Sequence, residues 1–235
     1  MLKDRLISIC KQHVLTDSDS IVVKEPYIPY IPDNWNRILV LAESQNLSDT
    51  NSKYVNTLIG NNEDWRCDRL NKRFPIDSIV GVYPWDDGSV KIAIEAALGV
   101  KASETAVSNA VLWSQRGSSE QNITPGISLQ IRSISLWKEM LEVLNPEKIV
   151  CCGKIAANVI SETGINAKVL KWRLPAKTAM SRVSGMFEMD DLLKRFPEVK
   201  NTIDRHPEWI YKDNYQLNKV FFACHAVSMR HADDV

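Results

Sequence analysis

The 235-residue sequence contains no apolar run longer than a β-strand, so it predicts no membrane-spanning helix. Its first residues, Met1–Arg5, include Asp4 and lead into an amphipathic pattern, which is unlike a secretory signal peptide. The chain also has no internal repeat and no low-complexity tract. We therefore expect a cytoplasmic protein that does not bind a membrane. Its 44% hydrophobic and 25% charged residues are ordinary for a globular domain.

Cysteine and glycine are arranged in ways that argue against several kinds of site. The five cysteines include no C-x-x-C pair, and Cys151, Cys152 and Cys224 fall in apolar runs, where free cysteine behaves as a small hydrophobic residue. These spacings argue against a metal site, an iron–sulfur cluster and a disulfide framework, and we expect no cofactor. Gly153 stands alone, without the spacing of a Walker or dinucleotide-binding loop, which argues against a nucleotide-binding protein.

The formal net charge is zero, so a nucleic-acid partner would need a local basic surface. One candidate is the stretch between Glu162 and Glu188, which contains no acidic residue. Such a stretch can follow the phosphates of a nucleic acid, or it can be an ordinary solvated basic face. Its basic residues are Lys168, Lys171, Arg173, Lys177 and Arg182.

Hydrophobic periodicity predicts alternating helices and strands. An N-terminal helix is indicated by the apolar spacing of residues 2–14, and the proline-rich residues 25–32 are expected to follow an extended path over the surface. Further helices are predicted at residues 89–98, 134–144, 155–160 and 190–196, three of which end at Gly99, Asn145-Pro146 and Pro197. Strands are predicted at residues 37–42, 78–83, 107–113, 148–153, 168–172 and 220–224.

Strands separated by helices predict a parallel sheet that is covered by helices on both faces. The expected fold class is therefore α/β, a three-layer α/β/α sandwich with a mainly parallel central sheet. Residues 1–36 are expected to form a helix and lead-in packed on a single domain of residues 37–235. In such sheets, ligands bind at the carboxyl ends of the strands. Polar positions would meet at that edge: Glu43–Asn46, Asn109, Gly153 and the segment after Trp172.

Asn109 is a single uncharged amide inside the apolar run Val107–Trp113. An amide inside such a strand is costly unless it finds hydrogen-bond partners. It offers both a donor and an acceptor, as the edge of a pyrimidine base requires. The alternative is that Asn109 caps a neighbouring loop.

Four blocks of sequence, in this order, resemble the uracil-DNA glycosylase superfamily, and the resemblance covers roughly residues 37–187. The blocks are Leu39–Asn46, Ser108–Val111, Asn145–Ala156 and Leu174–Ser181. The resemblance implies a DNA partner and a base that is extruded from the stack. It also implies that Glu43 orients the attacking water and that Asn109 binds the Watson–Crick edge of the extruded base. We expect the protein to be a monomer.

Other site residues follow from their positions relative to these blocks. Substrate-binding candidates are Ser44 and Asn46 and, as the aromatic residue that stacks on the base, Tyr54, Tyr83 or Trp85. Met180 is a candidate for the apolar wedge that fills the gap left by the base. Core packing is the alternative for Met180 and for the three aromatic residues. The full set of DNA-binding candidates is Lys171, Arg173, Lys177, Met180, Ser181 and Arg182.

The sequence also departs from the family pattern. Leu174 stands where the family has the His that stabilises negative charge on the leaving base, and the Pro of the first motif is absent. Asn46 stands where the uracil-specific branch has the Tyr that blocks C5 substituents. The cysteines of the iron–sulfur branch do not match. The lost His is expected to be replaced by the basic stretch or by His225, which follows the predicted last strand and begins a His-x-x-Ser spacing that ends at Ser228.

These features predict a monofunctional DNA glycosylase, with Glu43, Asn109 and His225 as catalytic candidates. Without the blocking Tyr, the C5 side of the base is expected to be open. The preferred substrate is therefore a bulky C5-modified cytosine, hydroxymethylated or glucosylated, in bacteriophage DNA, and the biological role would be antiviral defence. Two alternatives stay open: a repair glycosylase for uracil or another deaminated base, and a non-catalytic nucleic-acid-binding protein with the same fold.

Overall fold

The structure, a computed structural model, is built around one five-stranded sheet in the order β1-β3-β2-β4-β5. β2, β3, β4 and β5 are parallel, and β1 pairs with β3 in the antiparallel direction at one edge. The strands are β1 (Ile21–Val23), β2 (Ile38–Ser48), β3 (Ala106–Gly117), β4 (Lys148–Cys152) and β5 (Lys168–Trp172). The structure describes residues 2–16, 21–23, 26–29, 31–48, 88–117, 124–173, 184–210 and 216–230.

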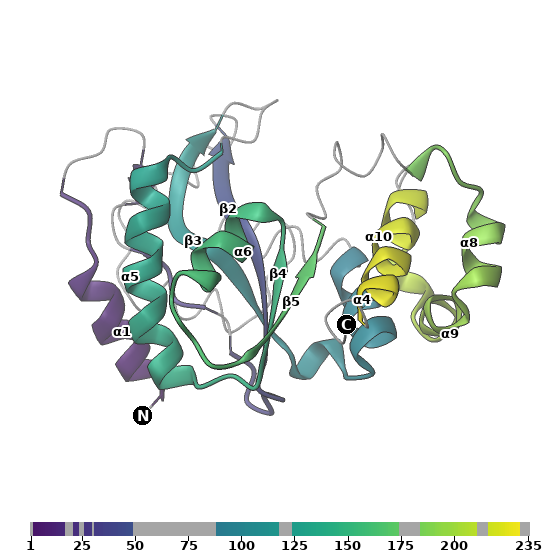
Figure 1. The fold of residues 1–235 in the computed structure, drawn as a ribbon, viewed down its shortest axis with the longest axis horizontal. Helices are drawn as coiled ribbons and strands as arrows, with labels where there is room; N and C mark the ends of the chain where they lie inside the picture. Colours follow the sequence, from purple (N-terminus) through teal and green to yellow (C-terminus); the bar gives the residue numbers. More distant parts are fainter. Residues whose placement is uncertain are drawn as a thin grey trace.

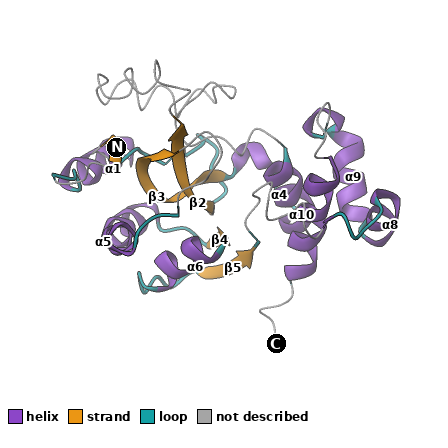
Figure 2. Ribbon diagram, turned by 90° about the horizontal axis from the view of Figure 1, so that it is seen from above, coloured by secondary structure: helices purple, strands orange, loops and turns teal. Residues whose placement is uncertain are grey.

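Helices cover both faces of this sheet, which confirms the predicted three-layer α/β/α sandwich. Figure 2 shows α1, α5 and α6 on one side of the strands and α4 and α10 on the other. In Figure 1 the carboxyl ends of β2, β3 and β5 point toward the top of the view. The helices are α1 (Leu2–Gln12), α4 (Ser89–Leu98), α5 (Ile127–Leu144), α6 (Lys154–Ser161), α8 (Met189–Arg195), α9 (Pro197–Arg205) and α10 (Gln216–Met229), with short 3-10 turns at Ala102–Glu104 and Pro207–Trp209.

The core lies along the two central strands. Leu39, Val40 and Leu41 of β2 and Ile149 and Val150 of β4 are fully buried, because helices pack on both faces of the parallel sheet. On the neighbouring strand β3, the backbone carbonyl of Ala110 accepts a hydrogen bond of 2.8 Å from Trp137 Nε1, which ties α5 to the sheet. No helix in the described ranges is long and apolar enough to cross a membrane.

The predicted helix ends are confirmed where a residue can adopt a left-handed conformation. α4 ends at Gly99, which has φ 68° and donates its N–H to the Glu95 carbonyl at 3.1 Å. α5 ends at Asn145, which has φ 45° and donates to the Leu141 carbonyl at 2.7 Å. Pro197 ends α8 and at the same time begins α9, where its missing N–H costs nothing.

The predicted last strand at residues 220–224 is wrong, because this segment lies inside helix α10. Val220, Phe222 and Ala223 are fully buried there, in a helix that packs against α4 and β5. A continuous apolar run of this length has no polar face, so its periodicity does not distinguish a buried helix from a buried strand.

Two other expectations need correction. β2 does not end at Ala42 but continues to Ser48, because β3 pairs with it to the end while β4 pairs only as far as Leu41.

Residues 26–29 do not run over the surface. Tyr27 is 4% exposed and donates its backbone N–H to the Leu112 carbonyl at 2.8 Å, so this extended segment is part of the core. The predicted strand at residues 78–83 lies outside the described residues.

Candidate functional site

Glu43 lies on β2, two residues after the last residue of this strand that pairs with β4. The pairing of β2 with β4 stops at Leu41 and Cys151, and the chain then turns through Gly153 into α6. Glu43 Oε1 accepts a hydrogen bond of 3.4 Å from the backbone N–H of Ile155, in the first turn of that helix. The carboxylate therefore sits above the carboxyl end of β4, at the positive end of the α6 dipole.

Gly153 makes this approach of the carboxylate possible. A Cβ atom at residue 153 would lie 2.6 Å from Glu43 Oε1, and the backbone has φ 99°, which disfavours every residue with a side chain. The N–H of Gly153 donates to the Trp172 carbonyl at 3.0 Å, which ties this turn to the end of β5. The sequence marks Gly153 as a turn, but its contact with Glu43 depends on the tertiary structure.

Glu43 is half-buried, and its environment changes its acidity. Burial raises the pKa of Glu43 above the ordinary value for a Glu, and the hydrogen bond from Ile155 offsets this only in part. A carboxylate with a raised pKa is a stronger base than an exposed one. This suits a group that accepts a proton from water.

His225 reaches the same edge from α10. Its Nε2 accepts a hydrogen bond of 3.2 Å from the backbone N–H of Arg173, the residue that precedes Leu174. Burial lowers the pKa of His225, and the charge of Arg173 lowers it further, so the imidazole is neutral at pH 7. Since Nε2 is the acceptor, the ring proton is on Nδ1.

The expectation that His225 follows a strand is wrong, because His225 lies within α10. Ser228 Oγ donates to the His225 backbone carbonyl at 2.7 Å, one helical turn away. The His-x-x-Ser spacing is therefore a feature of α10 and does not form a loop. His225 nevertheless contacts Arg173, the last described residue after β5.

Glu43, Gly153, Arg173 and His225 thus form a line along the carboxyl ends of β2, β4 and β5. Each neighbour in this line is joined to the next by a close contact or through the backbone: Glu43 to Gly153, Gly153 to Trp172, and Arg173 to His225. We call these four residues the edge cluster. It places a carboxylate and an imidazole at the ends of the neighbouring strands β4 and β5, from positions 182 residues apart in sequence (225 minus 43).

Asn109 lies on β3 at the level of Ala42, with which it pairs, and is 1% exposed. Its Nδ2 donates to the Tyr27 hydroxyl at 2.5 Å. Its Oδ1 has no hydrogen-bond partner among the residues that the structure describes. Because side chains alternate along a strand, Glu43 and Asn109 leave the sheet on opposite faces. The described structure therefore does not bring Glu43 and Asn109 to one face of the sheet, although both were expected at the same edge.

Some of the other predicted site residues lie in the described part of the chain, and the rest lie outside it. Ser44 is half-buried and pairs with Val111, and Asn46 pairs with Gln115 within β2 and β3. Lys171 and Arg173 are exposed at the carboxyl end of β5. The following residues lie outside the described ranges: Tyr54, Tyr83, Trp85, Leu174, Lys177, Met180, Ser181 and Arg182.

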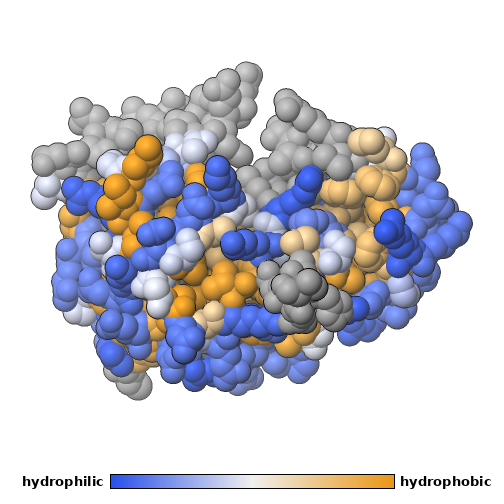
Figure 3. Space-filling view, viewed as in Figure 1, coloured by the Kyte–Doolittle hydropathy of each residue, from blue (hydrophilic) through white to orange (hydrophobic). Residues whose placement is uncertain are grey.

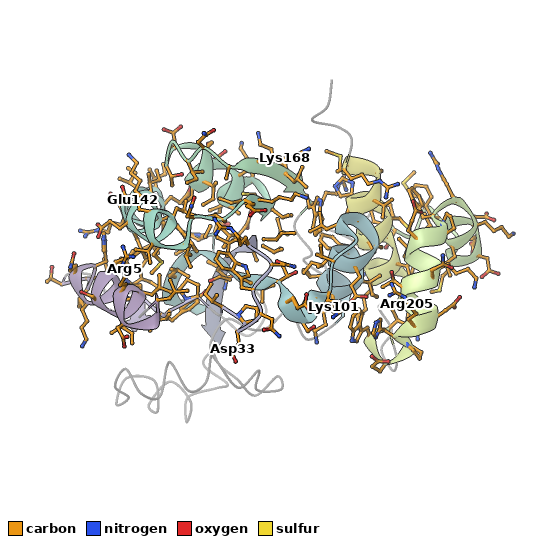
Figure 4. All side chains as sticks on the ribbon, turned by 90° about the horizontal axis from the view of Figure 1, so that it is seen from below. Arg5, Asp33, Lys101, Glu142, Lys168 and Arg205 are labelled. Carbon is orange, nitrogen blue, oxygen red and sulfur yellow. The ribbon has the colours of Figure 1, made fainter. Side chains whose placement is uncertain are left out.

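Charged side chains surround the molecule on all sides, in keeping with its zero net charge. In Figure 4 the labelled residues point outward from separate elements: Arg5, Asp33, Lys101, Glu142, Lys168 and Arg205. Lys168 begins β5 and so lies at the opposite end of the strand from Arg173. Of the described basic residues in this stretch, Arg173 therefore belongs to the edge cluster and Lys171 lies two residues before it, whereas Lys168 does not lie at this edge.

Three exposed apolar side chains, which the sequence analysis did not single out, lie in α5 and just before α8. Ile127 and Ile131, in the first turns of α5, are 77% and 58% exposed, and Met186 is 78% exposed. Figure 3 shows hydrophobic side chains at the surface over the top of α5. The ring of Phe187 packs on Phe221 of α10, with 5.4 Å between centroids.

Metal-binding groups do not gather in the part of the chain that the structure describes. No three His, Cys, Asp or Glu residues there are placed to hold a metal ion. Cys10, Cys151, Cys152 and Cys224 are free and buried, and burial raises the pKa of Cys151 and Cys224 to about 12, so both remain thiols.

The chain matches no protein-family model and no curated protein.

Proposed function

We propose that this protein is a monofunctional DNA glycosylase, which hydrolyses the N-glycosidic bond of a pyrimidine extruded from DNA and leaves an abasic site. The observation that carries the proposal is the edge cluster, in which Glu43 contacts the turn at Gly153 after β4 and His225 contacts Arg173 after the neighbouring strand β5. Glycosidic hydrolysis needs a carboxylate near the sugar and a hydrogen-bond donor near the leaving base.

In the proposed reaction, the C1′–N1 bond breaks and its electron pair stays with the base. Glu43 stabilises the cationic sugar and accepts a proton from the water whose oxygen bonds to C1′. The Nδ1–H of His225 donates to the oxygen on which the departing base carries its negative charge. That base then takes up the proton removed from water, so one water molecule is consumed for each base released.

Asn109 is proposed to bind the edge of the base, and Lys171 and Arg173 to contact DNA phosphates. A buried amide with an unused acceptor is suited to a polar ligand, because a buried polar atom is normally paired. Exposed basic residues at the carboxyl end of β5 add the local positive charge that the neutral chain lacks overall.

The substrate is proposed to be a cytosine with a bulky C5 substituent, such as a hydroxymethyl or glucosylated group. This part rests on the resemblance, in which Asn46 replaces the Tyr that blocks C5. Such bases are abundant in some bacteriophage genomes and absent from most hosts. An enzyme specific for them would attack viral DNA and spare host DNA, which is a defence function.

The proposal is tested with matched duplexes that carry uracil, cytosine, hydroxymethylcytosine or glucosylated hydroxymethylcytosine at one position. Free base is measured by mass spectrometry, and abasic sites are measured as alkali-labile breaks. We expect release from the C5-modified duplexes. Robust uracil excision without activity on modified DNA would support the repair alternative. DNA binding with no base release from any duplex would support the non-catalytic alternative.

Replacing His225 with Leu is expected to lower base release by about 10- to 100-fold, because the variant cannot donate a hydrogen bond to the developing charge. The measurement is single-turnover release at pH 7, with DNA affinity determined separately. The matched control is His13→Gln, since His13 pairs with Glu139 of α5 away from the edge cluster. Equal rates for the His225 variant and the wild type would remove His225 from the mechanism.

Replacing Lys171 and Arg173 with Gln is expected to weaken DNA binding on every sequence tested. The slope of log K against log salt should become shallower by about 0.9 for each phosphate that the variant no longer neutralises. Binding is measured by fluorescence anisotropy between low and moderate salt. Lys138→Gln, at an exposed position of α5, is the control. An unchanged salt slope would place the DNA-binding surface elsewhere.

A further inference from the structure

Two hydrogen bonds of the edge cluster meet on one peptide unit, the unit that joins Trp172 to Arg173. Its C=O, from Trp172, accepts the N–H of Gly153 at 3.0 Å, and its N–H, from Arg173, donates to His225 Nε2 at 3.2 Å. A trans peptide unit is planar, and its C=O and N–H point in opposite directions. One rigid group therefore lies between Gly153 and His225 and is bonded to both.

Such a chain of hydrogen bonds is cooperative. Donation from Gly153 to the C=O polarises the peptide unit and makes its N–H a better donor to His225. A displacement of the turn at Gly153 therefore reaches His225 in two ways: it moves the rigid unit, and it weakens the N–H that the imidazole accepts.

The other contact of Gly153 is with Glu43. A Cβ atom at residue 153 would lie 2.6 Å from Glu43 Oε1, 3.1 Å from its Cδ and 3.2 Å from its Cγ. These are the three nearest atoms outside the adjoining residues, and all belong to one flexible side chain. An added methyl group would therefore displace the Glu43 carboxylate, which accepts the Ile155 N–H at 3.4 Å, more readily than it would displace backbone.

We propose that Gly153 is a positioning residue, which sets the place of the Glu43 carboxylate by direct contact and the place of the His225 imidazole through the Trp172–Arg173 peptide unit. This inference rests on the proposed function and adds to it the residue that couples the carboxylate to the imidazole. Gly153 acts through these two side chains and supplies no reacting group of its own.

The activity test is Gly153→Ala, measured as base release from the best duplex substrate. We expect kcat to fall by about 10²-fold with a nearly unchanged KM, because a displacement of about 1 Å in a catalytic group has an effect of this size. An unchanged kcat in Gly153→Ala would overturn the inference.

Gly164→Ala is the matched control. Gly164 also has a positive φ, 71°, but a Cβ atom there would meet no atom within 4 Å. The control thus introduces backbone strain of the same kind without the contact, and its kcat should stay at the wild-type value. An equal loss of kcat in both variants would mean that strain alone causes it, which also overturns the inference.

Nuclear magnetic resonance tests both contacts without catalysis. In the wild type, an Hα proton of Gly153 should show a nuclear Overhauser contact to the Hγ protons of Glu43, and its absence would overturn the direct contact. The nitrogen resonance of His225 Nε2, which reports the bond from Arg173, should move in Gly153→Ala and stay in place in Gly164→Ala. A resonance that stays in place in Gly153→Ala would overturn the link to His225.

The same measurements separate this inference from the proposed function. If the Gly153–Glu43 contact is present and the His225 resonance responds to Gly153→Ala, while the wild type releases no base from any duplex, the proposed function fails and the coupling of the two side chains is retained.

Discussion

Replacing Glu43 with Gln is expected to lower the rate of base release by about two to four orders of magnitude. Gln keeps the shape of the side chain and can still approach Gly153, but it neither accepts a proton from water nor stabilises a cationic sugar by charge. DNA affinity should change little, since the loss concerns the transition state. The expected pattern is therefore a lower kcat with a nearly unchanged KM.

The measurement is single-turnover base release from the best duplex substrate, with protein in excess. The control is Glu142→Gln, which removes a carboxylate from an exposed position of α5, away from the edge cluster. If Glu43→Gln releases base at a rate within a few fold of the wild type, Glu43 is not the residue that activates water.

The pKa of Glu43 also predicts how the thermal stability of Glu43→Gln compares with that of the wild type as the pH changes. Burial raises this pKa in the folded protein above the unfolded reference of 4.5, so the folded state binds the proton more tightly. The protonated Glu43 side chain thus stabilises the folded state. This stabilisation is fully present below the unfolded pKa and is lost as the pH rises through the folded pKa. Gln does not ionise, so Glu43→Gln is expected to unfold at a higher temperature than the wild type at pH 7, and this advantage should shrink toward pH 4. A variant less stable than the wild type at pH 7 would show that the ionised carboxylate is favourably held.

Local signals predicted the helix ends and most strands. Gly99 and the pair Asn145-Pro146 stop helices for reasons that act within one turn, and the buried strands at residues 38–42 and 148–152 are apolar on both faces, as parallel strands are. The extent of β2 could not be predicted, because polar residues after Ala42 are kept in the strand only by the neighbouring β3. β1 was missed because three residues are too few to show the alternation of apolar and polar side chains that predicts a strand.

The site was only partly predictable for the same reason. Glu43 and Asn109 were found because a resemblance marks their positions in the chain. Tyr27 was missed because its proline-rich segment was expected at the surface, and only tertiary pairing beside Leu112 brings its hydroxyl to Asn109. His225 was proposed in the wrong local structure, and its contact with Arg173 depends on the packing of α10 beside β5.

Replacing Asn109 with Ala is expected to lower base release by about 10²- to 10³-fold, the usual cost of one precisely placed hydrogen-bonding group in an active site. Stability should change little. The substitution removes one made hydrogen bond, which leaves the buried Tyr27 hydroxyl without its Asn109 donor, and it also removes one unpaired acceptor, Oδ1. A made bond contributes about 1 kcal/mol, and an unpaired buried acceptor costs about 1–3 kcal/mol, so the two effects oppose each other. The measurements are single-turnover release and urea unfolding.

Asn36 provides the matched control, because both ends of its side-chain amide are hydrogen-bonded. It lies just before β2, at the end of that strand opposite Glu43. Its Nδ2 donates to Thr105 Oγ1 and its Oδ1 accepts the Ile38 N–H, each at 3.0 Å. Asn36→Ala removes two made bonds and leaves buried partners behind, so it should cost about 1–3 kcal/mol of stability and leave the rate per folded molecule unchanged. The two variants are thus expected to show opposite patterns. If Asn109→Ala instead loses stability as Asn36→Ala does and still releases base normally, Asn109 is a structural amide and the base is bound elsewhere.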